Sequence, residues 1–148
     1  MKCLVLMVAI VFSVGSAEDQ AHQEDDFASI RKEAVAKCSK EHNINEGAIK
    51  DILNHIQVAQ DEEVKCWTNC VMKSLGILKE RTIDWARLED ILNSASKNEN
   101  KTQVHLLVEM CRSKVDQADK NECQVAYSLV VCKIKYWNQL GLPKGNWE

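Results

Sequence analysis

The sequence has little of what breaks helices or builds sheets. Its 148 residues contain one proline, Pro143, which lies beyond the last segment with helical periodicity. No alternating apolar run between turn-forming residues is present, so we expect no β-sheet. These absences predict an all-α fold.

The motifs of common enzymes are also missing. The sequence contains no G-x-S-x-G, no H-E-x-x-H and no phosphate-binding P-loop. A secreted calcium-dependent phospholipase, another small helical protein with disulfides, needs a histidine–aspartate pair and a glycine-rich loop. Neither is present. We therefore expect a protein that is not an enzyme and needs no cofactor.

The first seventeen residues, 1–17, have the pattern of a secretory signal peptide. Lys2 provides a basic start, an apolar run continues to Val14, and the small residues Gly15 and Ala17 precede the expected cleavage point. The apolar run is too short to span a membrane. We expect a single mature domain over residues 18–148, in which residues 140–148 form a C-terminal tail.

Long runs of one charge are absent from the mature chain. Without the signal peptide, 18 basic and 22 acidic residues remain, a formal charge of −4. Nucleic-acid binding needs a basic surface, so this composition argues against nucleic acid as a partner.

Helical periodicity and capping residues place six helices along the mature chain. The last is expected to open with Asp119 and Glu122, a D-x-x-E arrangement that resembles a capping box. The expected helices cover approximately residues 27–41, 46–56, 61–78, 84–95, 102–115 and 119–139.

Removal of the signal peptide leaves six cysteines, an even number that favours disulfides in an exported protein. Six cysteines allow fifteen pairings. Cys66 and Cys70 lie four residues apart on one face of a helix, so their side chains point the same way. Cys123 and Cys132 are nine residues apart, about 180° around a helix. Excluding bonds within these two pairs leaves ten pairings.

A metal or redox site is the alternative use of these thiols. Structural zinc usually takes two close pairs of ligands, and Cys66 and Cys70 are the only close pair here. The C-x-x-C motif of redox sites is absent. We therefore expect no metal site.

The gaps between successive cysteines, 27, 3, 40, 11 and 8 residues, resemble those of the six-cysteine insect odorant-binding proteins. The 3-residue and 8-residue gaps are the most constant in that family. The segments VKCWTNCVMKSLGIL (Val64–Leu78) and KCSKEHNINEGAI (Lys37–Ile49) are similar to its third-helix motif and its first helix junction. The resemblance covers about Phe27–Gln139. It implies the disulfides Cys38–Cys70, Cys66–Cys123 and Cys111–Cys132.

The resemblance also implies a function. It indicates a compact six-helix domain with three interlocked disulfides around an apolar cavity. Such a protein is secreted, for example into sensillar lymph, and carries small hydrophobic molecules such as odorants or pheromones to receptors. The alternatives are a non-olfactory scavenger or an interaction protein in venom, saliva or reproductive fluid. A small apolar ligand, an odorant receptor and a second copy of the chain are the candidate partners.

The candidate ligand-binding residues are apolar or amphipathic side chains on several helices, each of which ordinary core packing would explain as well. They are Ile52, Leu53, Ile56, Val71, Met72, Leu75, Leu88, Leu92, Leu107, Met110, Tyr127, Leu129 and Trp137.

Three further features leave alternatives open. Asn100 begins an N-x-T sequon and is a candidate glycosylation site. Leu140, Leu142 and Trp147 in the tail form either a lid or a frayed end. The four histidines either trigger ligand release in acid, as the resemblance suggests, or are ordinary solvated surface groups.

Overall fold

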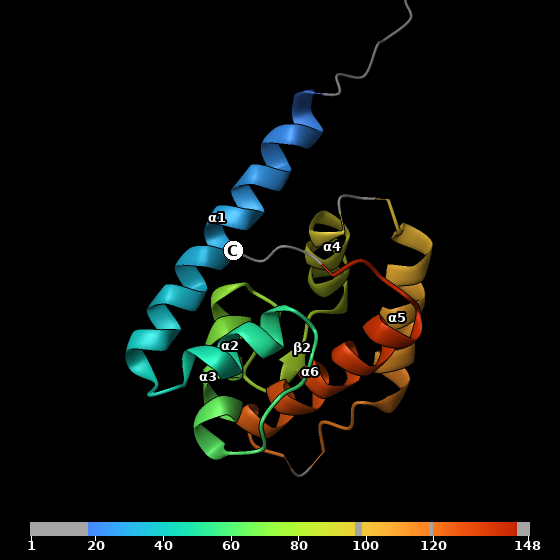
Figure 1. The fold of residues 1–148 in the computed structure, drawn as a ribbon. Coiled ribbons are helices and arrows are strands. Elements are labelled where there is room, and N and C mark those ends of the chain that lie inside the picture. The colour runs from blue at the N-terminus through green and yellow to red at the C-terminus, as the bar shows by residue number, and fades with distance from the viewer. Residues whose placement is uncertain (1–17, 97–98, 119, 145–148) are drawn as a thin grey trace, which may run out of the picture.

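The computed structural model describes residues 18–96, 99–118 and 120–144, with side chains described from Phe27 onward. The expected signal peptide lies outside this part of the chain, as does Trp147 of the tail. The described residues form six helices and one short hairpin, which confirms the all-α class (Figure 1). The elements are α1 (Glu18–Glu41), α2 (Glu46–Leu53), α3 (Glu62–Ser74), β1 (Leu78–Lys79), β2 (Thr82–Ile83), α4 (Trp85–Ala95), α5 (Lys101–Lys114) and α6 (Glu122–Gln139).

Side-chain caps fix where four of the helices begin. Asn45, Asp61 and Asp84 each accept a backbone N–H hydrogen bond from the first turn of α2, α3 and α4. Such caps satisfy donors that have no partner inside the helix. The expected start of α6 at Asp119 is wrong. The N-cap is Asn121, whose side chain and that of Gln124 exchange reciprocal hydrogen bonds of 2.9 Å with each other's backbone in a capping box.

Helix α3 ends four residues earlier than expected, and a hairpin follows it. Gly76 adopts φ +72°, a left-handed conformation that glycine tolerates and that ends the helix. The Ile77 N–H then donates to the Met72 carbonyl at 2.9 Å. Strands β1 and β2 pair antiparallel, with Leu78 opposite Ile83. The expectation of no strand is wrong here, because a two-residue strand is too short to show an alternating pattern.

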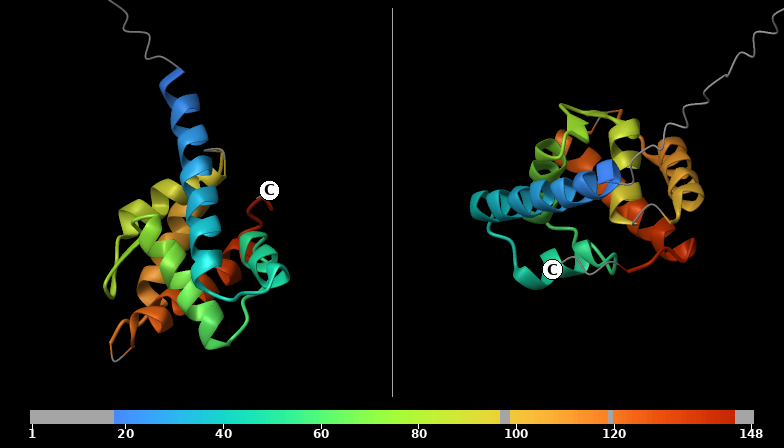
Figure 2. Two further views of the ribbon diagram at one scale, coloured as in Figure 1. Left: turned by 90° about the vertical axis from the view of Figure 1, so that its left-hand side faces the viewer. Right: turned by 90° about the horizontal axis from the view of Figure 1, so that it is seen from above.

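Helix α1 begins nine residues before the expected start at Phe27. No proline or glycine interrupts the acidic segment that precedes Phe27, and acidic residues suit a helix N-terminus. The N-terminal part of α1 extends beyond the other helices (Figure 1 and Figure 2).

Helix α3 is the centre of the fold, since it packs against α6 on one side and α1 on another. Three disulfides link four helices in a chain, α1 to α3, α3 to α6 and α6 to α5. They are Cys38–Cys70, Cys66–Cys123 and Cys111–Cys132. This is the pairing that the resemblance implied. Helices α2 and α4 carry no cysteine, so packing and hydrogen bonds alone hold them to this covalent frame.

Candidate functional site

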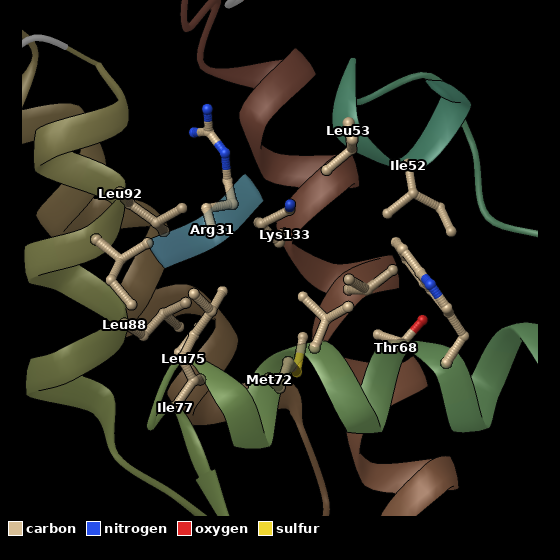
Figure 3. Close-up of a pocket in the computed structure, with 14 residues that line it drawn as sticks. Arg31, Ile52, Leu53, Thr68, Met72, Leu75, Ile77, Leu88, Leu92 and Lys133 are labelled. Carbon is tan, nitrogen blue, oxygen red and sulfur yellow. The ribbon is translucent and has the colours of Figure 1, made fainter. Parts of the chain in front are cut away.

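An apolar pocket of about 80 Å³ lies inside the helical shell (Figure 3). Its walls come from α1, α2, α3, α4 and α6, together with the segment that leaves α3. The fourteen lining residues are Arg31, Ile52, Leu53, Trp67, Thr68, Val71, Met72, Leu75, Ile77, Leu88, Ile91, Leu92, Val130 and Lys133.

Helix α3 supplies one wall of the pocket. Trp67, Val71 and Leu75 repeat every four residues and therefore lie along one side of the helix. Trp67 is 1% exposed, and its indole N–H donates to the Ser39 hydroxyl of α1 at 3.1 Å. The ring is thereby fixed in place while its apolar part lines the pocket.

Helices α2 and α4 supply the facing walls. Ile52 and Leu53 end α2, while Leu88 and Leu92 occupy successive turns on one face of α4. Figure 3 shows these two pairs on opposite sides of the pocket. Both helices that lack disulfides therefore contribute directly to the lining.

Seven of the thirteen candidate ligand-binding residues line this pocket. They are Ile52, Leu53, Val71, Met72, Leu75, Leu88 and Leu92. They come from three helices that the helical periodicity placed separately, and the tertiary structure brings them together.

The other six candidates lie elsewhere. Leu107 and Leu129 are 0% exposed and belong to the packed core. Met110 packs against the same core from a half-buried position. Ile56 follows α2 and is 55% exposed, which leaves it on the surface.

Tyr127 and Trp137 on α6 also lie away from the pocket. Tyr127 lines a shallow surface hollow, and the Lys65 ammonium lies 5.5 Å from the centre of its ring. Trp137 is fully buried, with its indole N–H donating to the Pro143 carbonyl at 3.1 Å.

The start of the C-terminal tail folds against α6 rather than across the pocket. Leu142 is 6% exposed, and its N–H donates to the Trp137 carbonyl at 3.1 Å. Neither Leu140 nor Leu142 is among the residues that line the pocket.

Two cationic side chains are the lining residues that sequence reasoning missed most clearly. Arg31 comes from α1 and Lys133 from α6. Burial of the Lys133 ammonium, and then the nearby Arg31 charge, lower the pKa of Lys133 to about 8. Burial also lowers the pKa of Arg31. The sequence held a weak signal for Lys133, since it follows the sixth cysteine on a helix with two apolar sides.

Thr68 is the third polar residue of the lining and was also missed. It is 2% exposed, and its hydroxyl donates to the Val64 carbonyl at 2.8 Å, one helical turn earlier. The hydroxyl proton is therefore committed to α3, while the oxygen can still accept a hydrogen bond.

The histidines separate into two kinds among the described side chains. His42 is half-buried and lies 3.3 Å from Glu63, while His105 is exposed and lies 3.0 Å from Glu89. His55 is 1% exposed, so the expectation of a solvated surface histidine is wrong for this residue.

The His55 ring stacks parallel on the Trp137 ring, with 4.1 Å between ring centroids. Burial, and secondarily the Lys133 charge, lower the pKa of His55 to about 2. The imidazole is therefore neutral inside the fold, because a charged ring would lose its hydration there.

One group of potential metal ligands occurs among the described residues, formed by Glu41, His42 and Cys70. Cys70 is bonded to Cys38. A disulfide sulfur is not a thiolate, which is the form that binds metals. This group therefore does not form a metal centre in the oxidised protein.

None of the helices in the described part of the chain has the length and apolar character needed to cross a membrane.

Six helices, three disulfides and an apolar pocket between the helices define a helical protein that binds small molecules. The PBP/GOBP family model matches residues 18–136, and this chain belongs to that family of insect odorant-binding proteins. Its members are non-enzymatic proteins that bind small hydrophobic ligands. The disulfides are consistent with an extracellular location.

Two individual proteins illustrate the relationship. Odorant-binding protein 10 of Aedes aegypti is 25% identical over 114 residues, which cover 75% of this chain and 77% of that protein. The solved structure of odorant-binding protein dmelOBP28a from Drosophila melanogaster matches with a TM-score of 0.67 at 19% identity. The match covers 81% of this chain and 99% of that one, and it shows that the two share a fold.

Proposed function

We propose that this protein is a secreted carrier that binds odorants, pheromones or similar small hydrophobic molecules in the pocket between α2, α3 and α4. It takes them through aqueous fluid to receptors. The observation that carries the proposal is the apolar lining of this pocket, because eleven of its fourteen lining residues are apolar. Covering a ligand's apolar surface there contributes about 25 cal/mol per Å², and no covalent step is needed.

The size of the pocket sets a condition on this function. Pockets for drug-sized ligands usually measure about 300–1,000 Å³, whereas this one measures about 80 Å³. A ligand longer than a few heavy atoms must therefore displace part of the wall. Helices α2 and α4 are the walls outside the disulfide-linked frame. We expect them to move apart, with the flexible Met72 side chain adapting to each ligand.

A binding assay with a pocket-filling variant tests the carrier function. The mature protein with its disulfides intact is titrated with the fluorescent apolar probe N-phenyl-1-naphthylamine. Octanal and 1-octanol are then used to displace the probe. Leu88→Trp adds bulk to the wall of the pocket, where Leu88 is 2% exposed. Ile56→Trp adds the same bulk at an exposed position and is the matched control.

We expect the wild type and Ile56→Trp to bind the probe and Leu88→Trp to lose at least about tenfold in affinity. Far-UV circular dichroism checks that Leu88→Trp is folded. Val71→Phe, at a half-buried lining position, is the milder replacement if it is not. Probe binding by a folded pocket-filling variant at wild-type strength would place the binding site elsewhere. A wild type that binds neither the probe nor the two ligands would leave an interaction protein as the better explanation.

The setting of the function is tested separately. Immunolocalisation to antennal lymph supports the transport of odorants. Localisation only to venom, saliva or reproductive fluid would make the protein a carrier or scavenger outside olfaction.

A further inference from the structure

The pocket contains two cations and no anion. Arg31 and Lys133 line it, while none of its fourteen residues is an aspartate or glutamate. Figure 3 shows these two side chains on one side of the pocket and Met72, Leu75 and Ile77 on the opposite side. The site therefore has a positively charged end and an apolar end.

Lys133 holds its charge in an unfavourable place. The residue is partly buried, and its ammonium forms no ion pair among the described residues. An ammonium that is partly shielded from water and has no counter-ion loses hydration and gains no ion pair in return. Its lowered pKa, to about 8, has burial as its largest cause and the Arg31 charge as its second. Both causes would be offset by one negative group beside the ammonium.

We propose that the natural ligand is an amphipathic anion, an unbranched apolar chain ending in a carboxylate that pairs with the Lys133 ammonium beneath Arg31. This inference rests on the proposed carrier function and specifies the class of its cargo. The carboxylate lies at the charged end, and the chain extends toward Met72 and Ile77.

The charge of the head group selects this class. A carboxylate accepts charge-assisted hydrogen bonds, which are roughly twice as strong as neutral ones. An alcohol of the same length presents only a neutral hydroxyl to Lys133, and an amine brings a third positive charge. A chain of the same length covers the same apolar surface in all three molecules. The head group alone therefore determines the order of affinity.

Isothermal titration calorimetry of the mature, oxidised protein with octanoate, 1-octanol and octylamine tests this at about pH 7, where the carboxylate is ionised. We expect octanoate to bind about ten- to a hundredfold more tightly than 1-octanol, and octylamine to bind most weakly. In Lys133→Met, which keeps the length of the side chain without its charge, octanoate should lose that advantage while 1-octanol binds within about twofold of wild type.

Lys135→Met is the matched control, because Lys135 lies on the same helix but is exposed. It should bind all three compounds like the wild type. Lys133→Met is not expected to unfold, because it removes a partly buried charge that has no counter-ion among the described residues. With octanoate labelled by 13C at its carboxyl carbon, the bound resonance should be shifted in wild type and less so in Lys133→Met.

The outcomes separate the two proposals. Equal affinity of the wild type for octanoate and 1-octanol, or an unchanged octanoate advantage in Lys133→Met, would overturn the assignment of an anionic ligand and leave the carrier function intact. Failure of all three compounds and of the fluorescent probe to bind would instead refute the carrier function itself.

Discussion

Acid should destabilise this protein through one buried histidine. His55 is 1% exposed and stacks on Trp137, and its pKa is lowered from 6.5 to about 2. Below pH 6.5 the unfolded chain binds a proton at His55 that the folded chain does not. The contribution to stability is therefore complete above pH 6.5 and is lost as the pH falls toward 2.

The magnitude follows from the size of the pKa shift. Once the unfolded histidine is mostly protonated, each further pH unit costs about 1.4 kcal/mol of unfolding free energy. Between pH 6.5 and pH 4.5 the loss from His55 alone is roughly 2 kcal/mol. Carboxylates add their own acid dependence, so the informative quantity is a difference between variants.

Urea denaturation of wild type, His55→Asn and His105→Asn at pH 6.5 and pH 4.5 measures that difference. Asparagine suits the left-handed backbone at position 55, where φ is +56°. His55→Asn loses the stack on Trp137, so we expect it to be less stable than the wild type at pH 6.5. On acidification to pH 4.5, however, its unfolding free energy should fall by roughly 2 kcal/mol less than that of the wild type. The control position, His105, is exposed and lies beside Glu89. Its variant should follow the wild type.

The same fall in stability for wild type and His55→Asn would refute the reasoning. It would mean that His55 takes up a proton inside the folded protein. An NMR titration of the imidazole resonances gives an independent reading, since the His55 signals should not titrate between pH 7 and pH 4.5 in the folded state.

Two further predictions concern the anion site and a helix cap. Octanoate affinity should be constant between about pH 6 and pH 8, where the carboxylate is ionised, and fall by about tenfold per pH unit above about pH 8, because a bound carboxylate favours protonated Lys133. Among the described residues, Arg31 on α1 and His55 after α2 are the ionisable groups that interact electrostatically with Lys133. Arg31 stays charged and His55 stays neutral over this range, so affinity that does not change between pH 7 and pH 9.5 would contradict pairing with Lys133. Asn121→Ala removes the N-cap of α6 and should cost about 1 kcal/mol of unfolding free energy in urea denaturation. An unchanged denaturation midpoint would show that the cap contributes nothing.

The sequence by itself determined the helical class, the starts of α2, α3 and α4 to within one residue, and the family. Asn45, Asp61 and Asp84 are capping residues placed directly before helical periodicity, and this is a local signal. The disulfide pairing came from the family resemblance of the cysteine gaps, because helix geometry alone left ten pairings open. The expectations failed at two places where the local signals were weak. A helix was expected to continue past Gly76, which instead ends it, and α6 was expected to begin at Asp119, whereas its N-cap is Asn121.

Only the tertiary structure decided which apolar residues surround the pocket. Leu92 and Leu107 both belong to the buried core, yet Leu92 lines the pocket and Leu107 does not. Helical periodicity tells which side of a helix is buried, but not whether the neighbouring helix fills the space opposite. The same holds for Arg31 and Lys133. They are more than 100 residues apart in the chain, and only the packing of α1 against the rest of the fold brings their two charges to one pocket.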